Sequence, residues 1–266
     1  MTFGLHKGLS YSVAEKKTER KSGSREAWRR ERLPCPSQQS QDGGVTMKRM
    51  VLLLGCLLLG GLFLSGCSNQ EAPFAEKAYT PEGTVRAIHL DVQDRAVEVV
   101  RSQDAQVHIQ YAENSKEYYE ISVSDDQVLT MTSASDKAWT DYVGGKPSDE
   151  DRRIVLQIPE GQLETLTLST TNEDISVPAL SVTGRMELSN NGGNILLENA
   201  AVGDTLSLTA KNGDITGTIV GRYEEFAIYT ERKKGESNLP EQKTEGEKTL
   251  QVSSNNGDID LSFVEA

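Results

Sequence analysis

The sequence predicts an all-β protein, and more narrowly a single-stranded β-solenoid with rungs of about 20 residues. A phrase of alternating apolar residues, a polar turn and an isoleucine recurs four times within residues 166–263, and the isoleucines are separated by steps of 20, 20 and 44 residues. Alternation of apolar and polar residues is typical of half-buried strands. It also extends upstream of the repeats, and no helical period is evident outside one apolar N-terminal segment.

The first 66 residues do not resemble a folded domain. Residues 1–46 are rich in Ser, Arg, Lys, Glu and Gln and show no apolar period, so we expect either a disordered leader or an upstream extension that a start at Met47 would omit. An apolar run over 50–63 follows two basic residues. That layout predicts a secretory signal peptide over 47–66, because the run is shorter than the ~20 residues that span a bilayer.

The signal segment ends in Leu64, Ser65, Gly66 and Cys67. These four residues resemble a bacterial lipobox, which implies that the Cys67 sulfur receives a diacylglyceryl group and that fatty acids such as palmitate anchor the mature chain. Two acyl chains hold a protein at a membrane where a single chain holds it weakly. The expected location is the cell membrane, with the domain facing the extracytoplasmic side.

Cysteine content and charge restrict the remaining possibilities. The three cysteines are Cys35, Cys56 and Cys67, so the mature domain has no thiol for a disulfide or a thiolate metal site. Removing the 11 basic and 5 acidic residues of positions 1–66 from the totals of 28 and 40 leaves 17 and 35, a net charge of −18. Such an acidic domain is not expected to bind nucleic acid, and we expect no cofactor.

The mature chain is predicted to begin with a polar tether over 67–84, followed by one β domain over 85–266. The strands upstream of the repeats are expected to form a less regular, antiparallel-like region. A loop with Trp139 and Tyr142 beside two glycines interrupts them. These aromatic rings are candidates for recognition of a sugar or ring, although they could equally cover an open end of the core.

Each repeat turns at a corner related to Asn-Gly-Asp-Ile. Asn and Gly accept positive φ, so we attribute the reversal of the chain to them. With stacking of about 4.8 Å, the residues before the isoleucines should form a ladder along one edge. Turn chemistry, a Ca²⁺ site and acid/base catalysis are three interpretations of this ladder. Its members are Asp174, Asn194, Asp214 and Asp258.

The ladder is imperfect, since Asn194 is neutral and the degenerate repeat places Lys233 and Lys234 near its register. We therefore expect turn chemistry and no metal or catalytic residue. A charged segment over 231–248 interrupts the array, and its composition predicts a solvated loop projecting from a corner. Arg232, together with the two lysines, is a candidate for recognition of a partner.

The order of these segments resembles the DUF4097 family, whose members are described as candidate adhesins with a β-solenoid fold. The resemblance rests on the strands of 88–111, on the phrase of 154–159 leading into the first repeat, and on the Asn-Gly-Asp-Ile corners at 212 and 256. It covers residues 85–264 and departs from the pattern at Glu173 and Gly192. It implies no catalytic residues.

Together these features predict a surface lipoprotein, not an enzyme, with a binding, adhesion or scaffolding role at the bacterial envelope. Its expected partners are the membrane, through Cys67, and a cell-wall polymer or an envelope protein. Two alternatives stay open: a solenoid enzyme that acts on cell-wall or extracellular glycan, and a cation-stabilised module of envelope-stress signalling.

Overall fold

The computed structural model describes residues 73–137 and 146–265, which consist almost entirely of β-strands. A single 3₁₀ turn, η3 (Tyr223–Glu225), is the helical element of this part, and the described residues contain no helix long and apolar enough to cross a membrane. The strands are β1 (Ala75–Tyr79), β2 (Ala87–Asp91), β3 (Ala96–Arg101), β4 (His108–Glu113), β5 (Glu117–Val123), β6 (Val128–Ser135), β7 (Arg153–Ile158), β8 (Thr165–Thr170), β9 (Ile175–Val177), β10 (Leu180–Val182), β11 (Arg185–Asn190), β12 (Ile195–Val202), β13 (Thr205–Ala210), β14 (Ile215–Val220), β15 (Phe226–Lys234), β16 (Gln242–Lys243), β17 (Lys248–Asn256) and β18 (Ile259–Val264).

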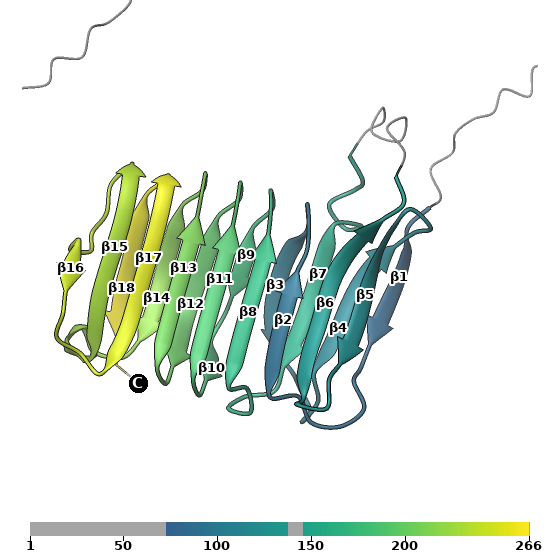
Figure 1. The fold of residues 1–266 in the computed structure, drawn as a ribbon, viewed down its shortest axis with the longest axis horizontal. Coiled ribbons are helices and arrows are strands. Elements are labelled where there is room, and N and C mark those ends of the chain that lie inside the picture. The colour runs from purple at the N-terminus through teal and green to yellow at the C-terminus, as the bar shows by residue number, and fades with distance from the viewer. Residues whose placement is uncertain (1–72, 138–145, 266) are drawn as a thin grey trace, which may run out of the picture. The chain divides into compact units, whose positions relative to one another are not determined.

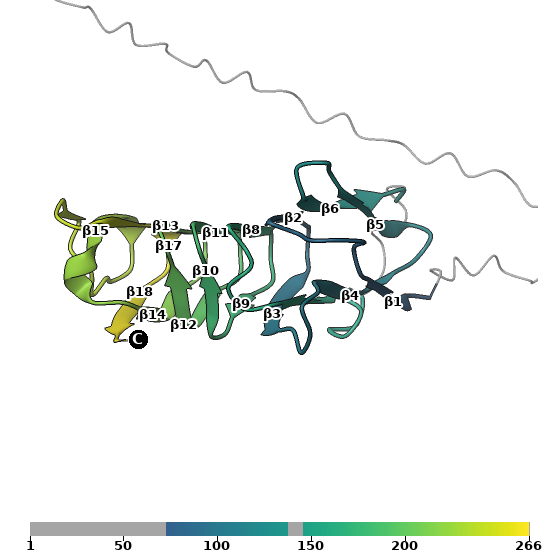
Figure 2. The same ribbon diagram turned by 90° about the horizontal axis from the view of Figure 1, so that it is seen from below.

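The strands form two nine-stranded sheets that face each other across one core (Figures 1 and 2). We call them sheet A, in the order β1-β4-β7-β3-β9-β12-β14-β18 with β10 also on β12, and sheet B, in the order β16-β15-β17-β13-β11-β8-β2-β6-β5. Each rung contributes one strand to sheet B and then turns a corner into sheet A. The predicted β-solenoid is confirmed.

The pairing registers reproduce the sequence period. In sheet B, Leu166 lies beside Met186, and Met186 beside Leu206, each step being 20 residues. The step of 44 residues is also a direct neighbour pair, because Leu206 lies beside Leu250. These strands are parallel, so the corner that follows each of them falls at the same edge of the array.

The order of rungs in space differs from their order in the sequence at both ends. After β14 the chain moves outward to β15, and it then returns to place β17 and β18 between that outermost strand and the rung before it. Near the N-terminus the chain makes the rung of β2 and β3 first, and the rung of β6 and β7 stacks outside it. Each end therefore closes by a strand that has already been laid down.

The first strands combine two kinds of pairing. β2, β3, β6 and β7 pair in parallel as ordinary rungs, whereas β1, β4 and β5 pair antiparallel at the outer end. The expected antiparallel-like region is therefore only this terminal layer. Strand β1 falls within the predicted tether over 67–84, and its pairing with β4 makes residues 75–79 part of the domain.

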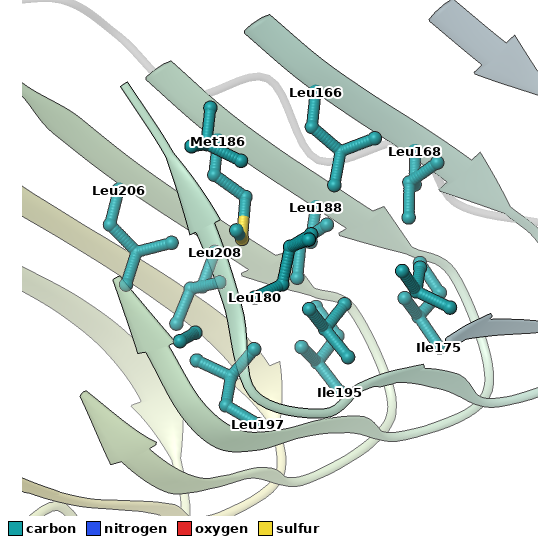
Figure 3. Packing of buried hydrophobic residues seen from close by; sticks show 14 of the residues in the cluster. Leu166, Leu168, Ile175, Leu180, Met186, Leu188, Ile195, Leu197, Leu206 and Leu208 are labelled. Carbon is teal, nitrogen blue, oxygen red and sulfur yellow. The ribbon is translucent and has the colours of Figure 1, made fainter. Parts of the chain in front are cut away.

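Alternating residues of every rung point into the space between the sheets (Figure 3). Leu168, Leu188 and Leu208 form one fully buried row, and Ile175, Ile195 and Ile215 form the facing row. The predicted third inward position holds for Leu180 and Ala200, but Ile219 replaces Val220, because an irregularity in β12 shifts the register by one residue. All core residues lie between Val85 and Leu261, so this domain carries its own core and can fold by itself.

Candidate functional site

The outer face of sheet B carries small polar side chains in register across its parallel strands. The residues that point outward from β8 are Thr165, Thr167 and Ser169, and they alternate with three buried residues. Neighbouring strands continue each column, so that Ser169 lies beside Ser189, and Ser189 beside Thr209. With strands about 4.8 Å apart, these columns form a regular array of hydroxyl groups on a flat surface.

The corner ladder is held together by side chain to backbone hydrogen bonds. The amide of Asn194 donates to Oδ1 of Asp174 at 2.7 Å, and the amide of Asp214 donates to Oδ1 of Asn194 at 2.9 Å. The same contact links the amide of Asp258 to Asp214 at 2.8 Å. Neutral Asn194 performs this role as well as a carboxylate does, because only an acceptor oxygen is required.

The ladder extends one rung further than the sequence pattern indicates. The amide of Glu236 donates to Oδ1 of Asp258 at 2.7 Å, so Glu236 occupies the position that we expected near Lys233 and Lys234. No group of three or more potential metal-ligating residues lies close together within 73–137 and 146–265. The hydrogen bonds favour the turn interpretation of the ladder over the cation and acid/base interpretations.

The glycines of the corner are required for a reason other than the expected one. None of Gly193, Gly213 and Gly257 has a positive φ, and neither do the asparagines before the last two, so the attribution to positive φ was wrong. A Cβ built at Gly213 would lie 2.0 Å from the carbonyl oxygen of Gly193, and one at Gly257 would lie 2.1 Å from that of Gly213. The glycines allow the backbones of successive rungs to stack closely.

Behind the ladder, buried polar side chains close the turns. Asn190 is 2% exposed, and its Oδ1 accepts the amides of Gly192 and Gly193 at 3.1 and 3.0 Å. Its Nδ2 donates to the carbonyl of Glu173 at 2.6 Å. One side chain thus bridges two rungs, in agreement with the rule that buried polar groups are hydrogen-bonded.

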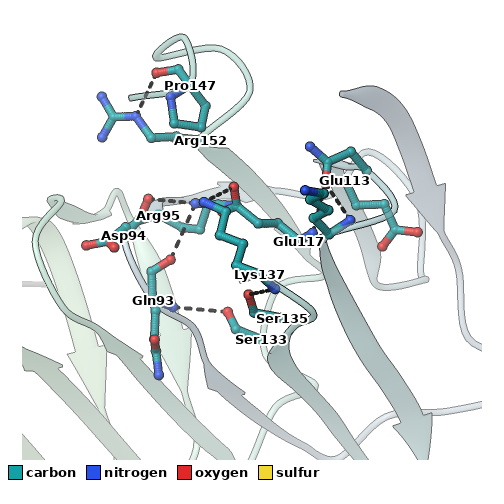
Figure 4. Close-up of polar contacts among 12 residues, drawn as sticks. Gln93, Asp94, Arg95, Glu113, Glu117, Ser133, Ser135, Lys137, Pro147 and Arg152 are labelled. Atoms are coloured by element: carbon teal, nitrogen blue, oxygen red, sulfur yellow. Dashed lines mark hydrogen bonds and ion pairs between the residues drawn. The ribbon is translucent and has the colours of Figure 1, made fainter. Parts of the chain in front are cut away.

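A charged network crosses the N-terminal end of the core (Figure 4). Arg95 is 4% exposed; it donates to the Tyr119 hydroxyl at 2.7 Å and to Oε2 of Glu117 at 2.8 Å. Lys137 forms an ion pair with the second carboxylate oxygen of Glu117. Arg95 also donates to the carbonyl of Asp94, so the network fixes the turn between β2 and β3.

The two cations control the charge of Glu117. Burial alone would raise the pKa of the Glu117 carboxyl, but hydrogen bonds from Lys137 and Arg95 outweigh burial and hold this pKa below its usual value. Burial would lower the pKa of Arg95, and the facing Tyr119 and Glu117 reverse that effect and raise it. The network therefore stays ionised at neutral pH.

Comparison with known proteins places this architecture in a family. The family model described as Toastrack DUF4097 matches residues 85–220 and 179–262. The chain belongs to the DUF4097 family. Among curated proteins, none matches the sequence.

Solved structures with this fold include candidate adhesion proteins of anaerobic bacteria. A candidate cell adhesion protein from Clostridium sporogenes is 13% identical and superimposes with a TM-score of 0.50, covering 72% of this chain and 100% of that one. A candidate adhesin from Parabacteroides merdae, 15% identical, covers 72% of this chain and 97% of its own, with a TM-score of 0.28. At such identities the similarity of the first structure shows the fold alone.

Several predicted site residues of this DUF4097 chain lie outside the described residues. They are the lipidation residue Cys67 and the aromatic residues Trp139 and Tyr142. Lipidation and aromatic recognition therefore stay predictions.

The charged segment of this DUF4097 domain is not a projecting loop, and that expectation was wrong. Residues up to Lys234 continue β15, and residues 236–238 then run along the edge of β18. Asn238 imitates a strand there, because its Nδ2 donates to the carbonyl of Leu261 at 2.9 Å and its Oδ1 accepts the Leu261 amide at 3.1 Å. The segment is the terminal cap of the solenoid.

The basic residues of this cap lie along its outer edge. Arg232, Lys233 and Lys234 are all exposed at the end of β15, beyond the short pairing with β16. Cations on an outer strand discourage edge-to-edge association, which gives these residues a structural role besides the predicted recognition. Sequence reasoning overlooked Asn190 and Asn238, although a polar residue immediately before the corner, as in Thr170 and Ser254, was a visible signal for the first.

Proposed function

We propose that this protein is a lipid-anchored binding protein of the bacterial cell envelope. In this proposal Cys67 carries the lipid, and the domain presents the outer face of sheet B to a polymer or protein on the extracytoplasmic side. The observation that carries it is the flat array of in-register polar side chains on this face. The adhesion role suggested for the Clostridium sporogenes protein of the same fold supports it.

Lipidation is tested by metabolic labelling. Bacteria that express the full chain or its Cys67→Ser variant are fed labelled palmitate and separated into membrane and soluble fractions. We expect a labelled wild-type protein in the membrane fraction and an unlabelled variant that is absent from the mature membrane pool. Equal labelling of both proteins would contradict the lipid anchor.

Binding is tested with the fragment 68–266, which contains the complete core. Saturable sedimentation with isolated cell envelopes is the expected result, and no sedimentation at any concentration would contradict the binding role. Contributions of the aromatic and basic candidates are measured with two double variants, Trp139→Ala with Tyr142→Ala and Lys233→Ala with Lys234→Ala. Deletion of 231–248 is unsuitable, because it would remove the terminal cap.

A further inference from the structure

The outer face of sheet B contains a shallow hollow that crosses four rungs. Its volume is about 300 Å³, and its lining comes from β8, β11, β13, β17 and the turns that follow them. We name it the hydroxyl hollow, after the column of outward residues along its floor: Ser169, Ser189, Thr209 and Ser253. Three strand spacings of about 4.8 Å give this column a length of roughly 14 Å.

The hollow differs chemically from the rest of this acidic domain. Lys211 is the single charged residue among the lining residues, and the others are hydroxyl or amide residues and one alanine. The column is flanked by carboxylates at both ends, since Asp91 lies beside Ser169 and Glu231 lies beside Ser253. The carboxylates thus delimit a neutral segment of four rungs.

The lining offers hydrogen-bonding groups that the described part of the protein does not itself use. Behind the hollow, Thr170 and Asn190 are fully occupied by backbone partners. By contrast, none of the column's four hydroxyls has a side-chain hydrogen bond within the described residues, and neither do the side chains of Asn191 and Asn255 at its rim. Such groups both donate and accept.

We infer that the hydroxyl hollow binds a neutral linear polysaccharide laid across the rungs. This inference rests on the proposed function and names the class of ligand for it. A hydroxyl-rich chain matches a lining that donates and accepts without charge. A nucleic acid would require clustered Lys and Arg, of which the hollow has one residue.

A peptide fits less well than a glycan. Peptide strands usually add to an open sheet edge. Each of the four strands that cross the hollow is paired on both sides, so no main-chain groups are available for such addition. The hollow is also shallow, and binding to one site is therefore expected to be weak and to gain strength from many anchored copies on one polymer.

The test uses fragment 68–266 and insoluble chitin, a neutral linear polysaccharide, as the probe. Thr209→Tyr fills the hollow, and Ser207→Tyr adds the same ring to the same strand two residues away, also pointing outward. We expect sedimentation of the wild-type fragment, at least tenfold weaker binding for Thr209→Tyr, and a change of less than about twofold for Ser207→Tyr. Thermal melting shows that both variants are folded, and if Thr209→Tyr is not, Thr209→Val should weaken binding about fivefold through loss of one hydroxyl.

Three results would overturn the inference. They are equal effects of the two tyrosine variants, binding of the wild type to gelatin but not to chitin, and stronger binding to polygalacturonate that Lys211→Gln abolishes. The same variants are sedimented with cell envelopes. If the wild type binds envelopes and Thr209→Tyr binds them equally well, the hydroxyl hollow is wrong and the envelope role stands, whereas no envelope binding by the wild type contradicts both.

Discussion

The middle of this solenoid and its two ends are stabilised in different ways. In the middle, β11 lies between β8 and β13 with every residue in register, and the same ladder and glycine contacts recur at each corner. At the ends there is no identical neighbour, and individual side chains supply the missing partners. Asn238 completes the edge of β18, and Arg95 with Glu117 and Lys137 closes the opposite end.

This contrast explains why repetition alone does not make a stable protein. A repeat buries its apolar residues only against neighbouring repeats, and terminal repeats therefore need distinct caps. Here the caps are also the places where the order of the rungs departs from the order of the sequence. The middle should consequently respond to changes in backbone geometry, and the ends to changes in single polar groups.

The largest effect should come from the glycine stack in the middle. Gly213→Ala would place a Cβ 2.0 Å from a backbone oxygen and 2.5 Å from its carbon, and neither atom can move as a flexible side chain would. We expect a loss of roughly 3 kcal/mol in the free energy of unfolding. In a domain of this size that lowers Tm by about 10 °C, measured by circular dichroism.

Gly161→Ala is the matched control, because it adds the same methyl group in open space. No atom lies within 4 Å of its Cβ, and the cost is the positive φ of 69° alone, about 1 kcal/mol. Equal losses for the two variants would show that close stacking does not govern the middle of the array.

The sequence predicts the middle well because its period is carried by local chemistry. Alternation sets the strands, and a fixed spacing between isoleucines sets the stacking, so the pairs Leu166 with Met186 and Leu206 with Leu250 follow from the text alone. The insertion of β17 inside β15 does not follow from it. A degenerate repeat has the same apolar spacing whichever side of its neighbour it occupies.

The candidate site is less predictable, for two physical reasons. The corner residues were identified, but the role of Gly213 depends on the distance to the next rung rather than on its own φ. The charged composition of 231–248 is typical of a solvated loop, yet backbone hydrogen bonds to β18 order part of it. Composition describes the preference of side chains for solvent and does not report main-chain pairing.

An intermediate effect is expected at the C-terminal end. Asn238→Ala removes both hydrogen bonds to Leu261 and leaves that amide and carbonyl at an uncovered edge. We expect a loss of about 1–2 kcal/mol. Hydrogen exchange measured by mass spectrometry should become faster in β18 and stay unchanged in β11, because the opening is local.

Asn255→Ala provides the comparison for that end. Its side chain has no hydrogen bond within the described residues, so the expected change in stability is within about 0.5 kcal/mol. Faster exchange in β11 as well as in β18 would argue against Asn238 as a local cap.

The smallest effect concerns pH and the N-terminal end. The pKa of Glu117 is lowered in the folded state, so its charge adds stability above the unfolded value of 4.5, and this contribution is lost as the pH falls through the lowered pKa. Glu117→Gln should therefore destabilise the domain at pH 7, by about 1 kcal/mol or less because the group is partly exposed, and much less at pH 3. Glu120→Gln, on the exposed face of the same strand, should cost little at either pH. Urea unfolding at both pH values measures the four differences, and a cost of Glu117→Gln that is the same at pH 3 and pH 7 would mean that packing, rather than the charge of this network, closes the end of the solenoid.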